Sequence, residues 1–260
     1  MKFLRASLTI ATAFAAAAWI SRLLLGRAPA RFATDLAQPL IVVTNWGLFG
    51  AAMLGVFLLA LAVAALPYRK AARNAASASP WLALTASALA LAAAGTMPVL
   101  FSSDVYAYAA YGELARLGTS PYVHAALGRA DALVTAAQWQ WGNALPVCVY
   151  GPAFVALAKA VVGATAAFGT LAQLNGTRAL ACASFLLATP LAFAAFPGDR
   201  AARLRAAATI GLNPPAIWCA IEGHNDAIAL AIVLAGFYLV RRGFSGTGAA
   251  VAALSALVKA

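Results

Sequence analysis

A carboxylate and several tyrosines follow a long apolar run in the segment 101–122, FSSDVYAYAAYGELARLGTSPY. In a helix over 104–116, Asp104, Tyr108 and Tyr111 recur at i, i+4 and i+7 and therefore share one face. The apolar run 81–101 ends just before Asp104, which places the carboxylate at the boundary between membrane and water, where it stays ionised. An ionised carboxylate in that position can accept a proton as a general base. Asp104 is therefore the first candidate for a catalytic residue.

The helix that carries Asp104 is expected to be short and amphipathic and to lie along the membrane surface. Leu114 and Leu117 would hold it on the membrane, and Gly118-Thr119-Ser120-Pro121 would end it, because Pro121 biases the preceding residue toward extended geometry. Two structural alternatives stand beside the catalytic one. Asp104 could serve as a helix cap, and the tyrosines could be interfacial anchors.

A second polar cluster, Glu222-Gly223-His224-Asn225-Asp226, follows an apolar segment that is interrupted at Asn213-Pro214-Pro215. A proline inside a spanning helix frees backbone carbonyls, which the membrane tolerates mainly beside protein or water. The interruption therefore indicates a polar cavity. The i, i+2, i+4 spacing of the two carboxylates and the histidine is a weak pattern for a divalent cation, Mg²⁺ or Mn²⁺. A histidine satisfied by its neighbours at a helix end is the commoner case.

The composition defines the class of protein that must position these residues. The chain has 260 residues, of which 64% are hydrophobic and 10% charged, and this excludes a soluble core. It predicts an all-α polytopic membrane protein. The net charge of +11 comes from small basic groups between apolar runs, which is typical of membrane topology and contact with anionic lipid, not of nucleic-acid binding. Three cysteines without ligand spacing are expected to be inert packing residues: Cys148, Cys182 and Cys219.

The apolar runs predict the spanning elements. We interpret the runs 6–20, 38–67 and 81–101 as three spans, with the apolar core of a signal peptide as the alternative for the first. The run 147–169 is apolar as well, but Gly151-Pro152 breaks its start and Lys159 lies in its middle. Hydropathy alone would count it as a further span.

The basic clusters decide how this run is counted. If 147–169 crossed the membrane, both Arg200-to-Arg205 and Arg241-Arg242 would lie outside, against the usual preference of Lys and Arg for the cytoplasm. We therefore expect a re-entrant or juxtamembrane helix over 149–169, followed by spans at 178–197, 206–221 and 227–240. Asp104 and the 222–226 cluster then face the same outer compartment. This topology leaves three basic residues outside and unexplained: Arg22, Arg27 and Arg31.

The segment 118–146 is too polar to span and carries two tryptophans, Trp139 and Trp141. Tryptophans in such a position are typical interfacial anchors, and stacking on a sugar face is the alternative.

Several short motifs follow one another in a characteristic order: an Asp soon after a span, a helix ending in GTSPY, then YGPAF, an Arg that opens a span, NPPAIW, EGHND and a closing LVK. This order resembles the GT-C superfamily of polyprenyl-phosphate-sugar glycosyltransferases. Within it, the chain looks most like the bacterial mannosyltransferases that use polyprenyl-phosphomannose. The resemblance covers about 101–260, and it rests on the order of the motifs and not on any one of them.

The resemblance implies a GT-C-like helical bundle with 1–80 as membrane anchor and 81–260 as the N-terminal part of an incomplete catalytic module. It places the catalytic acid of the first outer loop on Asp104, an acid of the second outer loop on Asp226, and the arginine near the lipid phosphate on Arg178. Residues expected to bind substrate are Tyr108, Tyr111, Pro121, Tyr122, Tyr150, Arg178, Glu222, His224, Asn225 and Asp226.

The implied activity is transfer of a hexose, in this family mannose, from a polyprenyl-phosphate donor to a hydroxyl of a glycan or lipid acceptor. The active site would face outward from the inner (cytoplasmic) membrane, and the anomeric configuration would invert. Two departures from distant relatives leave the phosphate ligand and a first-loop metal open: Tyr150-Gly151-Pro152 replaces a Lys-Pro-Pro pattern, and one acid stands at 104 in place of a pair.

The alternative from another class is a transporter or channel-like membrane protein without catalysis. Such a protein would favour inverted internal repeats and ionisable groups near mid-membrane. The sequence has no such repeat, and its acids cluster at the ends of apolar runs.

Overall fold

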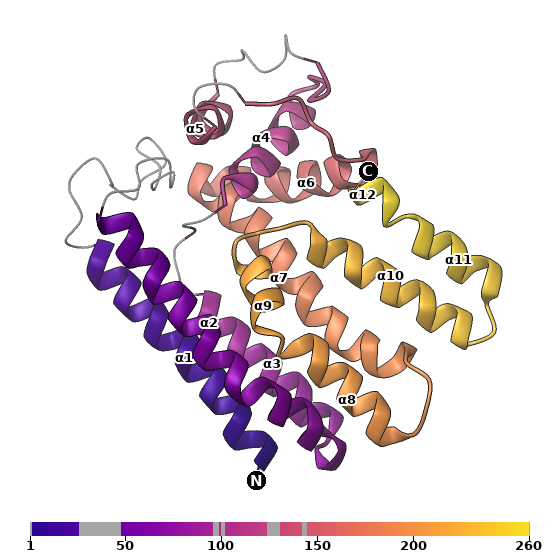
Figure 1. Ribbon diagram of the computed structural model, residues 1–260. Coiled ribbons are helices and arrows are strands. Elements are labelled where there is room, and N and C mark those ends of the chain that lie inside the picture. Colours follow the sequence, from indigo (N-terminus) through magenta and orange to yellow (C-terminus); the bar gives the residue numbers. More distant parts are fainter. Residues whose placement is uncertain are drawn as a thin grey trace.

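The computed structural model describes residues 2–25, 48–95, 99, 102–123, 131–141 and 145–259, and these ranges contain helices and no strand (Figure 1). The helices are α1 Lys2–Leu25, α2 Leu48–Asn74, α3 Pro80–Gly95, α4 Asp104–Arg116, α5 Ala132–Gln140, α6 Pro152–Thr165, α7 Thr170–Ala195, α8 Arg200–Gly211, α9 Pro214–Ile221, α10 Asp226–Arg241, α11 Ser245–Ala253 and α12 Ala256–Lys259.

Three of these helices, α1, α2 and α7, are long and apolar enough to cross a membrane, and α9 with α10 would make a fourth span that is bent by 117°. The prediction of an all-α membrane protein is confirmed. The first apolar run is one continuous helix that packs against α2 and α3. The helix of the third predicted span, 81–101, is shorter than expected: α3 has 16 residues, whereas a straight span needs roughly 20. The first part of the second predicted span, 38–47, lies outside the described residues.

Small and aromatic side chains fill the core between α1, α2, α3, α8 and α9. Ile10 and Phe14 of α1 are fully buried, and the ring of Phe57 on α2 lies 4.5 Å from the ring of Trp218 on α9. Alanines surround these larger side chains and allow the helix backbones to approach closely, as small residues do in membrane bundles. The break between α8 and α9 is therefore packed inside the bundle.

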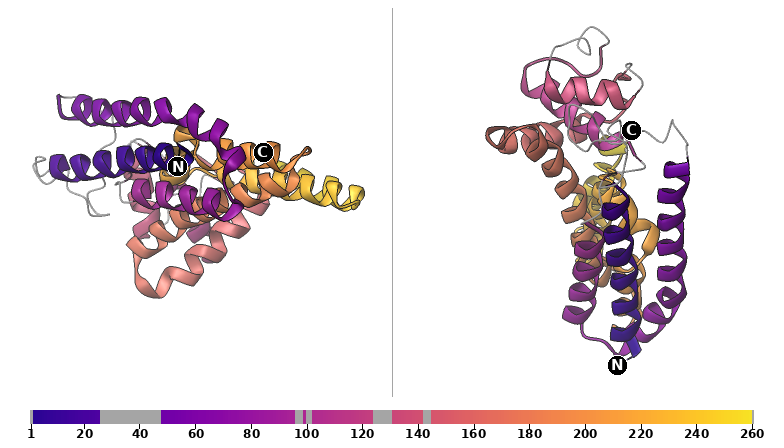
Figure 2. Two further views of the ribbon diagram at one scale, coloured as in Figure 1. Left: turned by 90° about the horizontal axis from the view of Figure 1, so that it is seen from below. Right: turned by 90° about the vertical axis from the view of Figure 1, so that its left-hand side faces the viewer.

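The helices α4, α5 and α6 lie together at the end of the bundle opposite to the N-terminus, as Figure 1 and the right-hand view of Figure 2 show. Gly151 is the N-cap of α6 and Pro152 occupies its first turn, where a missing backbone N–H costs nothing. In Figure 1, α6 runs across α7 and not alongside it. This helix has 14 residues, fewer than the roughly 20 that a straight span needs, and its expected position beside the membrane stays a prediction.

Four helix ends that carry basic clusters lie in the other half of the molecule, whereas the arginine-bearing ends of α1 and α4 lie in the same half as the rest of α4. In Figure 1 the start of α1, the end of α2, the start of α8 and the end of α10 all lie in the lower half of the view, away from α4. This arrangement agrees with the expectation that the basic clusters share one side. These ends carry Lys2, Arg5, Arg69, Lys70, Arg73, Arg200, Arg203, Arg205 and Arg241.

The helix predicted over 104–116 is present, but the prediction that one of its faces is polar and exposed is wrong. Ten of the 13 residues of α4, Val105 to Leu114, are buried. The helix packs against α5, α6 and α7, so Leu114 lies in the protein interior and does not contact the membrane surface. The sequence pattern failed here because it treated α4 as a two-sided helix, whereas α5 and α6 cover both sides.

Two predicted span boundaries also shift. The helix α7 begins at Thr170, so Arg178 lies in its third turn and does not open it. The predicted span 206–221 consists of two helices, α8 and α9, separated at Asn213. The side chain of Asn213 accepts a hydrogen bond from the backbone N–H of Ala216 at 3.2 Å and so caps α9, with Pro214 in its first turn.

Candidate active site

The carboxylate of Asp104 meets a histidine from a distant part of the chain. Asp104 is the first residue of α4, and its Oδ2 lies 3.2 Å from Nδ1 of His224, which belongs to the turn between α9 and α10. The hydroxyl of Tyr108, one turn later on α4, donates to the same oxygen at 3.3 Å. The side chains of Asp104 and His224 are 27% and 25% exposed, so a ligand can reach the pair.

An aromatic group supports this pair from inside the protein. The ring of Tyr108 lies edge-on to the rings of Tyr150 and Phe154, with centroids 5.0 Å and 4.8 Å away. Its hydroxyl also lies 3.2 Å from the Tyr150 hydroxyl and 3.4 Å from Oδ1 of Asn225. Four residues predicted to bind substrate thus share one hydrogen-bonding network with Asp104: Tyr108, Tyr150, His224 and Asn225.

The electrostatics of the pair favour ionised Asp104. The hydrogen bond from His224 lowers the pKa of Asp104, although burial acts in the opposite direction. The hydrogen bond to Asp104 in turn raises the pKa of His224, again against the effect of burial. Burial raises the pKa of Tyr108, which therefore stays a neutral donor. The pair therefore presents an ionised carboxylate beside an imidazole that can also take up a proton.

The turn that carries His224 has the geometry of a Schellman motif. The N–H of His224 donates to the carbonyl of Cys219, and the N–H of Gly223 donates to that of Ala220. Gly223 has φ +85°, and a Cβ there would lie 2.7 Å from Cγ2 of Val105 on α4. Glycine is needed at this position both for the backbone conformation and for the close approach that brings His224 to Asp104.

Glu222 and Arg178, two of the residues predicted to bind substrate, hold this turn in the structure. Glu222 is 1% exposed, and its Oε2 accepts a hydrogen bond from the backbone N–H of Ser102 at 3.0 Å. Nε of Arg178 donates to the carbonyl of Ile221, and Glu222 is close enough to interact electrostatically with the Arg178 guanidinium. The two side chains fix the turn against α7 and against the segment that leads into α4.

The last two residues of the 222–226 cluster, Asn225 and Asp226, face α12. Asn225 is fully buried, and its Nδ2 donates to the carbonyl of Val258 at 3.3 Å. Oδ1 of Asp226 lies 2.5 Å from Nζ of Lys259. Glu222, His224 and Asp226 therefore point to three different partners and do not form the ion site that their spacing suggested. In the part of the chain that the structure describes, no three His, Cys, Asp or Glu side chains form a metal-binding group.

The remaining predicted residues lie around the network and not in it. The Tyr111 hydroxyl donates to the carbonyl of Pro146 at 2.8 Å. The carbonyl of Pro121 accepts from the N–H of Cys148 at 2.9 Å, and the Tyr122 hydroxyl donates to the carbonyl of Tyr150 at 3.0 Å. Pro121 and Tyr122 thus brace the segment that presents Tyr150.

Trp141 and Lys259 also border the site. Nε1 of Trp141 donates to the carbonyl of Ser103, the residue before α4, at 3.3 Å. Lys259 belongs to the closing LVK motif, to which the sequence assigned no role. Only the packing of α12 against α6 and α10 brings this lysine to the acids, so no local signal could have found it.

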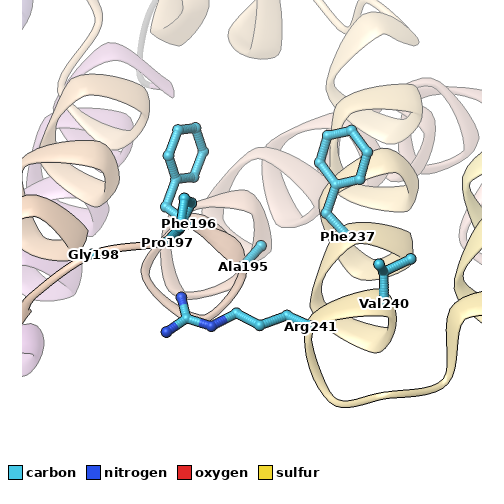
Figure 3. Close-up of a pocket in the computed structure, with 7 residues that line it drawn as sticks. All are labelled: Ala195, Phe196, Pro197, Gly198, Phe237, Val240 and Arg241. Carbon is cyan, nitrogen blue, oxygen red and sulfur yellow. The ribbon is translucent and has the colours of Figure 1, made fainter.

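A separate groove lies far from Asp104 along the helices. It lies between the C-terminal ends of α7 and α10 and has a volume of about 490 Å³. Figure 3 shows the rings of Phe196 and Phe237 on its two sides and the Arg241 side chain reaching across below Ala195. None of the predicted site residues lines this groove, so it is not part of the candidate active site.

Fold and site together define an integral membrane protein with a partly exposed acid–histidine pair near one end of its helices. Residues 4–260 match the family described as alpha-(1->6)-mannopyranosyltransferase, N-terminal domain, and the chain belongs to this family.

One relative is alpha-(1->6)-mannopyranosyltransferase A of Mycobacterium tuberculosis, which is 31% identical over 173 residues. The aligned region covers 64% of this chain and 31% of the relative, so the chain corresponds to about a third of that protein. No solved structure matches the chain.

Proposed function

We propose that the protein transfers a mannosyl group from a polyprenyl-phosphate carrier to an acceptor hydroxyl. The observation that carries this proposal is the Asp104–His224 pair, a proton acceptor that is held by buried neighbours and open to solvent on one side. Family membership supports a mannosyltransferase, and the resemblance of the motif order supports the lipid-linked donor. The site would face outward from the inner membrane, opposite to the basic helix ends.

The reaction needs little from the protein, because a sugar on a lipid phosphate is already activated. The acceptor oxygen forms a bond to the anomeric carbon while the bond from that carbon to the phosphate oxygen breaks. The acceptor proton passes to the Asp104–His224 pair, and the polyprenyl phosphate leaves with the bonding electrons. Attack and departure on opposite faces invert the configuration. Tyr108, whose hydroxyl lies beside Oδ1 of Asn225, orients the base.

The donor class is tested with purified protein, octyl α-mannoside as acceptor, and either a short-chain polyprenyl β-phosphomannose or GDP-mannose as donor. We expect transfer from the lipid-linked donor alone, with an α linkage in the product, because an inverting displacement turns a β donor into an α product. NMR of the product gives the linkage. Transfer from GDP-mannose alone, or a β product, would contradict the proposal.

The pH dependence of transfer tests whether the two side chains act together. We expect the rate to fall as the pH is lowered through the raised pKa of His224, above its ordinary value of 6.5. The reason is that an imidazolium beside Asp104 lowers the pKa of the carboxylate and weakens it as a base. His224→Gln removes this titration, so the acidic limb of its rate profile should move to lower pH. An unchanged acidic limb in this variant would mean that His224 does not titrate with the base.

A further inference from the structure

Lys259 is the lysine that the fold brings to the acidic residues of the site. Its Nζ lies 2.5 Å from Oδ1 of Asp226, and it interacts electrostatically with Asp104 and Tyr150 as well. Its side chain is 47% exposed. An ammonium group has three donors, and Asp226 accepts from one of them, which leaves capacity for an incoming anion.

Packing on both sides of α12 fixes the backbone that carries Lys259 at the site. Val258 is fully buried in a cluster with Tyr108, Phe154 and Ile228, and its carbonyl accepts the hydrogen bond from Asn225. The Leu257 backbone packs directly on Gly151, where a Cβ would overlap with the Leu257 carbonyl. The glycine of Tyr150-Gly151-Pro152 thus permits α12 to approach α6.

Arg178, the other cation expected near the phosphate, already interacts with groups of the protein. Arg178 donates to the carbonyl of Ile221 and interacts with the buried carboxylate of Glu222. An incoming phosphate would have to compete with both of these groups for the guanidinium. A phosphate would have to replace only Asp226 as the partner of Lys259, and the Asp226 side chain is 54% exposed. Exchange of an exposed ion pair costs little.

We propose that Lys259 binds the phosphate of the lipid-linked donor, which replaces Asp226 as the partner of its ammonium group. This rests on the proposed function, because it assumes a phosphate beside Asp104. The same lysine then stabilises the charge that stays on the phosphate when the bond to the sugar breaks. In this proposal Lys259 of α12 supplies the phosphate ligand that Tyr150-Gly151-Pro152 lacks in comparison with a Lys-Pro-Pro pattern.

The test measures binding of geranyl phosphate and of geraniol to the purified protein in detergent by calorimetry. We expect the wild type to prefer the phosphate, and Lys259→Met to weaken geranyl phosphate binding about tenfold or more, since hydrogen bonds to charged groups contribute that much. Lys259→Arg should restore part of the loss. Geraniol binding should be unchanged in both variants, and thermal unfolding without ligand checks that each one folds.

Two further variants separate phosphate binding from a structural ion pair. Lys159→Met removes an exposed lysine of α6 and should leave binding of the phosphate unchanged. Asp226→Asn breaks the ion pair but keeps the ammonium group, so geranyl phosphate binding should stay within about threefold of wild type. Equal losses in Lys259→Met and Asp226→Asn would overturn the proposal.

The binding measurements distinguish a failure of the role proposed for Lys259 from a failure of the proposed function. If the wild type binds geranyl phosphate no better than geraniol, the lipid-phosphate donor and the role of Lys259 both fall. If the wild type prefers the phosphate and Lys259→Met keeps the full preference, the donor class stands and Lys259 is not its ligand.

Discussion

Asp104→Asn is expected to lower mannosyl transfer by about 10²–10⁴-fold, the range that a general base contributes. The amide has nearly the size of the carboxylate and can still accept the hydrogen bond from Tyr108, so α4 and its surroundings should be retained. It cannot accept a proton from the acceptor. The rate is measured with the lipid-linked donor at equal amounts of folded protein in the membrane.

Two comparisons show whether this loss is chemical. Asp104→Glu keeps the base but displaces it by one methylene and should retain a small residual rate, because small misplacements of a catalytic group are costly. Asp104→Ala should show the same loss of rate as Asp104→Asn. If Asp104 only supported the first turn of α4, Asp104→Asn would transfer within a few-fold of wild type while Asp104→Ala would be unstable. That pattern would mean the base must be sought elsewhere.

Glu222→Ala is expected to lower the free energy of unfolding by about 1–3 kcal/mol, the usual cost of leaving a buried hydrogen-bond donor without its acceptor. Glu222 is 1% exposed, and the substitution would leave the Ser102 N–H without its acceptor and Arg178 without its nearby carboxylate. Titration of the purified protein with SDS in mild detergent, followed by tryptophan fluorescence, measures the change.

Asp226→Ala is the matched control, because it removes a carboxylate from the same cluster at an exposed position. Its ion pair with Lys259 should contribute about 0–1 kcal/mol. Glu222→Ala should also lose transfer activity in the fraction that remains folded, since the turn no longer holds His224 against Asp104. A Glu222→Ala protein as stable as Asp226→Ala would show that the buried carboxylate does not hold the turn.

Local patterns in the sequence were enough to predict much of the fold. The apolar runs predicted an all-α membrane protein, because the length and composition of a run are enough to identify a helix that can cross a bilayer. The expectation from Arg200 and Arg241 that 149–169 does not cross the membrane stays a prediction. The helix 104–116 has the predicted bounds because a turn rich in glycine and proline follows it. Its burial was missed, because periodicity does not tell which other helices will cover a face.

The sequence by itself determined which residues carry ionisable groups at the ends of apolar runs, and it placed Asp104 and His224 among them. Only the tertiary structure decided their partners. Asp104 pairs with His224 because Gly223 lets the α9–α10 turn pass against Val105, and Glu222 faces inward because Ser102 and Arg178 meet it there. Lys259 reaches Asp226 across 33 residues of sequence. Such contacts depend on which helices pack together, a property of the whole chain that no local spacing encodes.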